Sequence, residues 1–173
     1  MHRPRPSITD TPDRYIAVAV LVTETQRYLM KRRDDVPWIA FPDQWSFFGG
    51  GIEAGETPAQ ALCRELREEL GWQPETIEFF MQTRLLLPFP EAVLEDITFY
   101  AVPIAEAAIA EAAIAGLTLM EGAEMRLFHA AELQAMPNVI PQDLAVVLMH
   151  ARRDILFRAK QAAPPADSMP SGE

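Results

Sequence analysis

Both ends of one short helix are marked in the sequence. Thr57 and Gln60 form the pattern T-x-x-Q, in which each side chain can bond the backbone amide of the other residue. Pro58 stands at the first helical position, where proline is favoured, and Gly71 can adopt the left-handed conformation that ends a helix. These signals predict a helix over Thr57–Leu70.

The predicted helix carries an apolar stripe with carboxylates beside it. Its apolar residues recur at a spacing of about 3.6, so one face of the helix would pack on a sheet. They are Ala59, Leu62, Cys63, Leu66 and Leu70. Glu65, Glu68 and Glu69 stand three and four residues apart, so like charges repel across one helical surface. A divalent cation such as Mg²⁺ or Mn²⁺ would cancel this repulsion, although on spacing alone a solvated acidic face is an equal alternative.

The composition of the 173-residue chain excludes several classes of protein. The formal net charge of −10 argues against binding nucleic acid through a broad basic surface, because phosphate neutralisation needs clustered lysine and arginine. The single cysteine, Cys63, excludes an internal disulfide and fits a reducing compartment. No run of about 18 apolar residues predicts a membrane span, and no apolar stretch follows the basic start. We therefore expect a soluble, cytoplasmic protein without a membrane or nucleic-acid partner.

We expect one folded domain with two irregular ends. Residues 1–14 contain three prolines and mixed charge, which is typical of a flexible lead-in. The domain is expected over residues 15–160. Residues 161–173 are rich in Pro, Ala and Ser, a composition that predicts a disordered tail.

Runs of β-branched and aromatic residues predict a sheet beside the helix. The expected strands are Tyr15–Val22, Tyr28–Lys31, Thr76–Leu87, Ile97–Ile104 and Met125–Phe128. Two further helices are expected, Ala130–Ala135 and Pro141 to about Ala159. Asp34–Gln44 carries prolines and aromatic residues and predicts a loop of the kind that frames a site. Pro88–Asp96 is expected to connect two paired strands, and the tandem repeat EAAIA, residues 106–115, to form a short helix or an irregular excursion.

The frame around the three glutamates resembles the Nudix box, G-x5-E-x7-R-E-U-x-E-E-x-G-U, in which U is a large aliphatic residue. Trp72 departs from this pattern at the final U, and Phe48 stands where many family members have proline before the glycine pair. The resemblance implies an α+β fold, a Nudix-like α/β/α sandwich with a mixed central sheet. The fixed positions are filled by Gly50, Glu56, Arg64, Glu65, Glu68, Glu69 and Gly71, with Leu66 at the first U.

The resemblance also implies a metal site. Nudix enzymes hydrolyse a nucleoside diphosphate linked to another moiety, so a Mg²⁺-dependent phosphoanhydride hydrolase is expected, with Mn²⁺ as the alternative ion. Glu65 and Glu69 would be the main metal ligands, and Glu68 would be a third ligand or the base that takes a proton from water. The backbone carbonyl of Gly49 would add a neutral oxygen ligand. Because phosphoanhydride oxygens are anionic, such an ion must shield them before water can attack phosphorus.

Other residues of the box would support this site. By the same resemblance, Arg64 would hold the carboxylates in place and act in catalysis, and Glu56 would pair with Arg64. Gly50 and Gly71 would give structural support. A small-molecule nucleotide is therefore the expected partner, and because many Nudix proteins pair, a homodimer is an open alternative to a monomer.

A further catalytic glutamate is expected outside the box. Family members that cleave nucleoside triphosphates carry a glutamate in a Glu-Gly step before a late strand, and Glu121 resembles it. Its rivals in this sequence are Glu124, Glu95 and Asp96.

Four more residues are candidates for binding substrate. Arg33, at the end of the second strand, matches a position that often faces substrate phosphate, although an exposed arginine at a strand end is an equal alternative. Asn138, Gln142 and Asp143 follow a late proline turn, as do base-reading residues in the branch that acts on oxidised purines. For these three a turn or a helix cap is the commoner role.

Three functions remain open on the sequence. The first is a nucleoside triphosphate pyrophosphohydrolase, with oxidised purines as one candidate substrate class, which Glu121 and the compact length favour. The second is an ADP-ribose-type nucleotide-sugar pyrophosphatase, in which a proline often stands sixteen residues beyond the box, as Pro88 does here. The third is a non-catalytic Nudix module that senses a nucleotide. Such modules typically lose box glutamates, and none is lost here.

Overall fold

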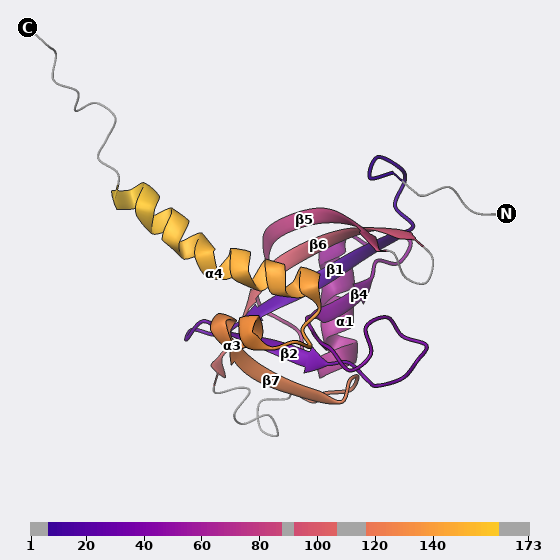
Figure 1. Cartoon of the computed structure of the whole chain (residues 1–173), viewed down its shortest axis with the longest axis horizontal. Coiled ribbons are helices and arrows are strands. Elements are labelled where there is room, and N and C mark those ends of the chain that lie inside the picture. Colours follow the sequence, from indigo (N-terminus) through magenta and orange to yellow (C-terminus); the bar gives the residue numbers. More distant parts are fainter. Residues whose placement is uncertain (1–6, 88–91, 107–116, 163–173) are drawn as a thin grey trace, which may run out of the picture.

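The computed structural model describes residues 7–87, 92–106 and 117–162, with 154–162 as backbone alone. These residues build a mixed sheet with helices packed against it (Figure 1). In chain order the elements are β1 (Arg14–Val22), β2 (Arg27–Arg32), β3 (Trp45–Ser46), β4 (Phe48–Gly51), α1 (Pro58–Leu70), β5 (Glu78–Leu87), β6 (Val93–Pro103), β7 (Glu124–His129), α3 (Ala130–Ala135) and α4 (Pro141–Ala162).

The first strand lies at the centre of the sheet. The main path runs β3-β2-β1-β6-β5, with β4 paired to β1 and β7 paired to β2. β1 and β6 run parallel, and the other pairs are antiparallel. The edge of β1 that faces away from β6 is shared, because β4 pairs with Ile16–Ala19 and β2 pairs with Val22. The glycine-rich β4 is therefore held against the central strand.

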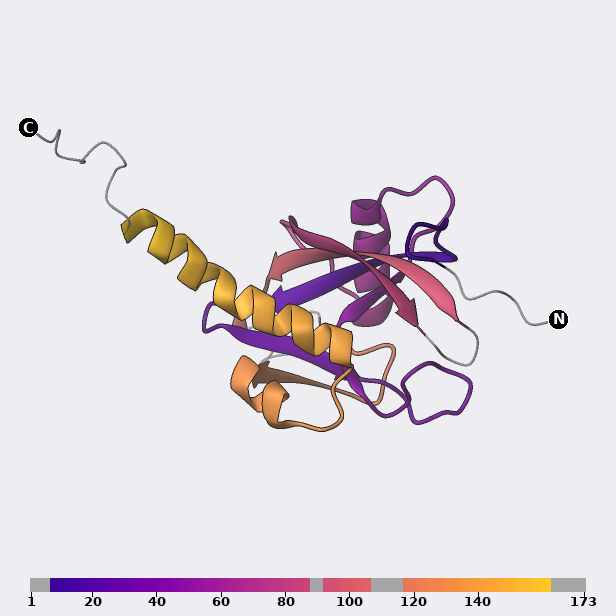
Figure 2. The same cartoon turned by 45° about the horizontal axis from the view of Figure 1, so that its top comes forward.

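Helices cover both faces of the sheet. Side chains of β1 alternate between two core clusters, since successive residues of a strand point to opposite faces. Ala17, Ala19 and Leu21 belong to the cluster that contains α1, and Ile16, Val18 and Val20 belong to the cluster that contains residues of α3 and α4. Figure 2 shows the sheet between α1 and α4. The predicted α/β/α sandwich with a mixed central sheet is confirmed.

Helix α1 begins and ends at the predicted residues. The Thr57 hydroxyl accepts a bond from the Gln60 amide at 3.3 Å, and the Gln60 side chain accepts one from the Thr57 amide at 2.9 Å. Gly71 has φ 62° and its amide donates to the Arg67 carbonyl. The apolar residues Ala61, Leu62, Leu66 and Leu70 are buried, and so is Glu69. One carboxylate of α1 therefore lies inside the protein at the edge of the apolar face.

The structure corrects the predicted connection between β5 and β6. Strand β6 begins at Val93, so Glu95 and Asp96 lie within the strand and not in the loop Pro88–Asp96. Both carboxylates are buried and have cationic partners on neighbouring strands: Arg14 of β1 is 3.6 Å from Glu95, and Arg84 of β5 is 3.0 Å from Asp96. These pairings make a strand with two adjacent acids stable, and the local sequence does not show them.

The folded part of the chain also differs at both ends from the expected 15–160. Asp13 donates its amide to the Leu94 carbonyl at 2.8 Å, and Arg14 is the first residue of β1, so the lead-in predicted over residues 1–14 overlaps the sheet. At the other end α4 continues to Ala162. The remainder of the predicted tail, the EAAIA repeat after Glu106, and Pro88 lie outside the described residues.

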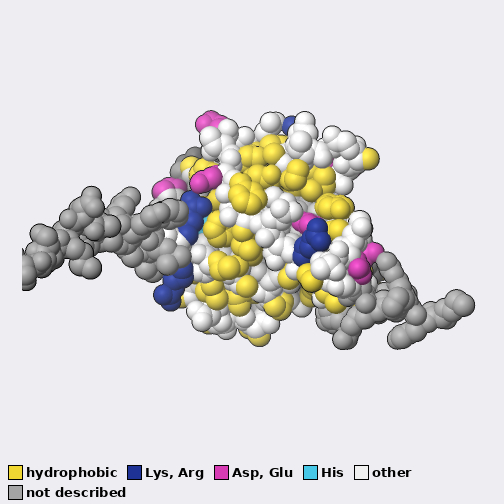
Figure 3. Space-filling view, turned by 90° about the horizontal axis from the view of Figure 1, so that it is seen from above, with side chains coloured by type: hydrophobic (Ala, Val, Ile, Leu, Met, Phe, Trp, Pro, Cys, Tyr) yellow, Lys and Arg dark blue, Asp and Glu magenta, His cyan; other side chains and the backbone are white. Residues whose placement is uncertain are grey.

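Part of the molecular surface is apolar. Seen from the β5 side, hydrophobic side chains cover much of the face in Figure 3. Exposed members of this kind include Phe79 and Leu86 on β5 and Met149 on α4. Within the described ranges, however, no helix is both long and apolar enough to cross a membrane.

Candidate functional site

A cavity of about 730 Å³ lies beside β1, β4, α1 and the start of α4, which is the usual size of a small-ligand site. Its lining is rich in charge and draws on elements distant in the sequence. The acidic side chains are Asp13, Glu65, Glu69, Glu95, Glu121 and Asp143, and the basic ones are Arg14, Lys31 and Arg33. The cavity therefore offers carboxylates that could bind a metal ion and basic side chains that could bind an anionic substrate.

Arg64 binds three carboxylates of the box region. Its Nε and Nη2 atoms donate to the two oxygens of Glu56 at 2.9 and 3.0 Å, and its Nη1 donates to Glu65 at 2.7 Å and to Glu68 at 3.3 Å. Nη2 also reaches the Gly51 carbonyl at 2.8 Å. The bonds from Arg64 lower the pKa of Glu56 to about 2. The glutamates thus have the partner that the box resemblance predicts, and they are fixed relative to β4.

Glu69 has different partners from Glu65 and Glu68. Its carboxylate accepts a bond from the Gly49 amide at 2.8 Å and forms an ion pair with Lys31. Both side chains of this pair are 3% exposed, and Lys31 also donates to Glu121 at 3.2 Å. Burial raises the pKa of Glu69, and the neighbouring Lys31 charge opposes that rise.

Sequence reasoning missed Lys31 as a site residue. The signal was the position of a lysine after the apolar run of β2, but its neighbours Arg32 and Arg33 make the same segment look like a basic strand end. Only the packing of β2 beside α1 and residues 120–123 shows that the ammonium points into the acidic cluster.

Two glycines allow the helix and the strand to approach. Gly49 has φ 130°, and a Cβ atom there would lie 2.2 Å from the Ala17 carbonyl oxygen. A Cβ at Gly50 would lie 2.6 Å from the carboxylate of Glu65. A side chain at Gly50 would push Glu65 away from β4, and a side chain at Gly49 would clash with the backbone of β1. These two glycines therefore form a cradle beside the carboxylates of α1.

The carboxylates of α1 and the backbone carbonyls beside them have the chemistry that a divalent ion requires of its ligands. Carboxylate and carbonyl oxygens are the donors that Mg²⁺ and Mn²⁺ prefer. The ligand geometry is not preformed, however: within the described part of the chain no three acidic, histidine or cysteine side chains converge on one point. The reason lies in the two cations, because Arg64 bonds Glu65 and Glu68 while Lys31 bonds Glu69.

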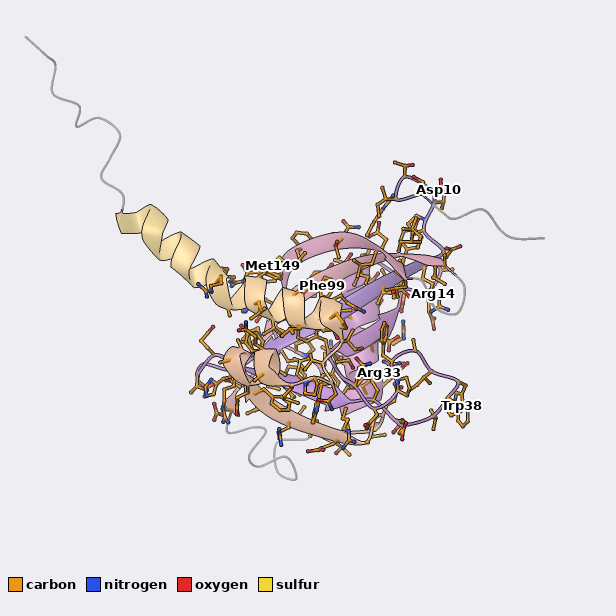
Figure 4. The ribbon with its side chains drawn as sticks, in the orientation of Figure 1. Asp10, Arg14, Arg33, Trp38, Phe99 and Met149 are labelled. Carbon is orange, nitrogen blue, oxygen red and sulfur yellow. The ribbon has the colours of Figure 1, made fainter. Side chains whose placement is uncertain are left out.

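A second buried carboxylate lines the cavity at the start of α4. Asp143 accepts a bond from the Phe47 amide at 3.0 Å. Burial raises its pKa to about 7, against the opposing effects of that amide and of the Arg33 charge. The Arg33 side chain is tied to the loop that follows β2, since its Nε donates to the Ala40 carbonyl at 2.9 Å. Figure 4 shows Arg33 beside the body of the protein and Trp38 further out on the same loop.

The structure brings together most of the predicted substrate contacts. Arg33, Gln142 and Asp143 all line the cavity. Asn138 is not among the lining residues, and its backbone carbonyl accepts a bond from the Trp45 amide at 2.8 Å. The segment before α4 is therefore held against β3 through its backbone, which leaves Asn138 outside the cavity.

The candidates for a further catalytic glutamate separate into two groups. Glu121 and Glu95 line the cavity, whereas Glu124 and Asp96 do not. Burial raises the pKa of Glu95, and the charge of Arg14 opposes the rise. Glu121 is the member of the group that also contacts the Lys31 ammonium.

Comparison with protein families and curated proteins gives a clear match. The model of the NUDIX domain matches residues 13–144 of the chain. An RNA pyrophosphohydrolase of Francisella tularensis subsp. mediasiatica is 36% identical over 69 residues, which are 40% of this chain and 40% of that protein. The chain spans less than half of the length of the first curated relatives it matches.

Solved structures resemble the fold over most of its length. A MutT protein from Methanosarcina mazei Go1 has a TM-score of 0.61 at 16% identity, covering 89% of this chain and 99% of that one. The NUDIX domain of Shewanella oneidensis NrtR, solved as a complex with ADP ribose, has a TM-score of 0.65 at 17% identity, covering 87% and 94%. At these identities the likeness shows the shared fold.

Proposed function

This chain belongs to the NUDIX domain family, and from that premise we propose that it is a Mg²⁺-dependent hydrolase that cleaves a phosphoanhydride bond in a nucleoside diphosphate derivative. One observation carries the proposal: Glu65, which is bonded to Arg64, and Glu69, which is bonded to the Gly49 amide, line a cavity large enough for a nucleotide. Glu65, Glu68, Glu69 and the carbonyl of Gly49 are the proposed ligands of the ion. When bound, such an ion supplies the positive charge that shields the phosphate oxygens.

The chain's own residues would divide the remaining work. Arg64, anchored by both oxygens of Glu56, positions the ligand carboxylates. A base that takes a proton from the attacking water must be able to pass it to solvent. The side chains of Glu68 and Glu121 are 61% and 66% exposed, so both meet this condition. Arg33 lines the cavity and is the proposed contact to substrate phosphate.

The preferred substrate in this proposal is a nucleoside triphosphate, with an oxidised purine as the specific form. Asp143 and Gln142 support it, because both line the cavity and offer polar groups for the edge of a base. With a pKa near 7, Asp143 can present either a protonated or an ionised carboxyl at neutral pH. Oxidation of a purine changes which ring positions donate and which accept hydrogen bonds, so such a group can distinguish the two forms.

A substrate panel tests the proposal. The protein is incubated with Mg²⁺ and each of several compounds: common nucleoside triphosphates, an oxidised purine triphosphate, ADP-ribose, and a triphosphorylated RNA. We expect release of pyrophosphate and a nucleoside monophosphate, with the highest kcat/KM for the oxidised purine, and no turnover after chelation of the metal. Exposed Glu75, replaced by glutamine, provides a control that keeps the site intact.

Other outcomes of the panel would replace the proposal. Preferential hydrolysis of ADP-ribose would establish the nucleotide-sugar alternative. A preference for the RNA would align the chain with the activity named for its Francisella relative. Silence across the whole panel would favour the non-catalytic sensor.

A further inference from the structure

Lys31 is a buried lysine inside the glutamate cluster. Its side chain is 3% exposed, forms an ion pair with the equally buried Glu69, and donates to Glu121 at 3.2 Å. A buried ammonium is costly unless it is paired and hydrogen-bonded. Here the partners of Lys31 are the same carboxylates to which the proposed function assigns metal binding and catalysis.

The surroundings of Lys31 accommodate both its charge and its stem. The ammonium lies 5.8 Å from the centre of the Phe48 ring, and an aromatic face attracts a cation at such a distance. Phe48 is the residue that stands where many family members have proline. Gly122, with φ 102°, brings the chain so close to β2 that a Cβ there would lie 2.9 Å from the Arg32 carbonyl oxygen and 3.6 Å from Cδ of Lys31.

The second acidic partner of Lys31 is held by backbone bonds. The Met120 amide donates to the Glu69 carbonyl at 2.8 Å, and the Ala123 amide donates to the Arg32 carbonyl at 2.9 Å. The segment that carries Glu121 is thus attached to the end of α1 and to the end of β2. The fold therefore brings the three charged side chains together through these backbone bonds. Their meeting is not a chance contact between mobile surface groups.

We propose that the Lys31 ammonium is a built-in cation that competes with the divalent ion for Glu69. The inference rests on the proposed function, because it concerns the metal affinity of the same site. In the structure one oxygen of Glu69 is held by Lys31 and the other by the Gly49 amide. An ion that uses this carboxylate must displace the ammonium or bear its repulsion at short range in a buried site. Lys31 therefore neutralises the cluster in the metal-free protein and weakens metal binding.

Direct measurement of Mn²⁺ binding tests this competition without any substrate. Dissociation constants are measured by electron paramagnetic resonance and calorimetry for the wild type, Lys31→Met and Lys31→Gln. Methionine keeps much of the length of the stem without charge, and glutamine keeps a donor for Glu69. We expect both variants to bind Mn²⁺ roughly tenfold or more tightly than the wild type, because a unit positive charge beside the ligands is gone.

A matched control removes the same charge one residue away. Arg32 pairs with Asp43 outside the cluster, so Arg32→Met lowers the net positive charge equally but leaves Glu69 and its partner unchanged. This variant is expected to bind Mn²⁺ as the wild type does. Tighter binding by Arg32→Met as well would mean that long-range charge alone accounts for the effect, and it would overturn the role of Lys31.

Thermal stability separates competition from a merely structural role. Without metal, the Lys31 variants are expected to melt below the wild type, because Glu69 and Glu121 lose their cation. Saturating Mn²⁺ should then raise the melting temperature of the variants by more than it raises that of the wild type. If Lys31 served only packing, its replacement would lower the melting temperature by the same amount with and without Mn²⁺. Lys31→Arg keeps the charge and should behave like the wild type in both measurements.

The possible results distinguish failure of this inference from failure of the proposed function. Equal or weaker Mn²⁺ binding by both uncharged variants overturns the competition alone. Absence of Mn²⁺ binding in the wild type and in the variants overturns the competition and the metal site together. Binding that is seen only in the variants supports the competition in its strongest form.

Discussion

Glu69 and Asp143 are two buried carboxylates that line one cavity and differ in what neutralises them. Each accepts a bond from a backbone amide of the same short segment: Gly49 donates to Glu69 at 2.8 Å, and Phe47 donates to Asp143 at 3.0 Å. Glu69 also has an ion pair with a buried lysine. Asp143 has the Arg33 charge as its cationic influence, and this effect is weaker than that of its amide bond.

The difference indicates two uses for the same kind of group. A carboxylate that must bind a metal ion works as an anion, and Lys31 opposes the rise in the pKa of Glu69 that burial causes. A carboxyl that reads a base works through hydrogen bonds, and Asp143, with a pKa of about 7, can donate or accept them near neutral pH. We infer that Glu69 serves the reaction and Asp143 serves recognition.

The largest expected effect is the difference between two single variants, in each of which one of these carboxylates is replaced by its amide. Glu69→Gln should lower kcat by roughly a thousandfold or more, because the metal's contribution to the transition state is several kcal/mol. Asp143→Asn should keep kcat within about tenfold of the wild type and change mainly the relative kcat/KM values among bases. Steady-state kinetics on the best substrate of the panel, with circular dichroism to confirm folding, measures both. Equal losses of kcat in the two variants would remove the distinction.

The box and its helix could be predicted because their signals are local. The cap residues of α1 lie next to the helix in sequence, and the spacing of Glu65, Glu68 and Glu69 determines which surface they share. The family resemblance adds roles to the same residues. Neither kind of reasoning requires knowledge of what packs against the helix.

The environments of Glu69 and Asp143, in contrast, depend on packing between distant segments. Lys31 reaches Glu69 only because β2 lies beside the end of α1, and Asp143 is buried only because α4 docks near β4. The sequence therefore predicted Asp143 as one of three equal candidates, although Asn138 lies outside the cavity. The local sequence places Glu95 in a connection for the same reason, since its partner Arg14 is eighty-one residues away.

The next largest effect concerns the pH dependence of stability. The pKa of Asp143 rises from its ordinary value of 3.8 to about 7 in the folded protein. Between these values the native state binds a proton that the unfolded chain has released, so this group's contribution to the free energy of unfolding falls as pH rises. The two pKa values correspond to a loss of at most about 4 kcal/mol, which Asp143→Asn should abolish.

Urea unfolding of the wild type and Asp143→Asn between pH 4 and pH 8 measures this contribution. The stability of the variant relative to the wild type should increase with pH and level off above neutrality. Replacement of the exposed Asp35 by asparagine provides the control for removal of a carboxyl at the surface. A difference between wild type and Asp143→Asn that is the same at every pH would contradict the raised pKa.

The smallest effect tests the charge of Arg33, which opposes the raised pKa of Asp143. Arg33→Gln should move the midpoint of the Asp143-linked stability change to higher pH, by less than about one pH unit, because the effect of Arg33 is smaller than those of burial and the Phe47 amide. Comparing Asp143→Asn with its parent in both backgrounds isolates this coupling. Arg32→Gln, which removes a charge paired with Asp43, should leave the midpoint unchanged. An unchanged midpoint in Arg33→Gln would mean that the charge of Arg33 does not affect the pKa of Asp143. An upward shift would mean that a substrate phosphate bound to Arg33, by neutralising the same charge, also favours the protonated form of Asp143.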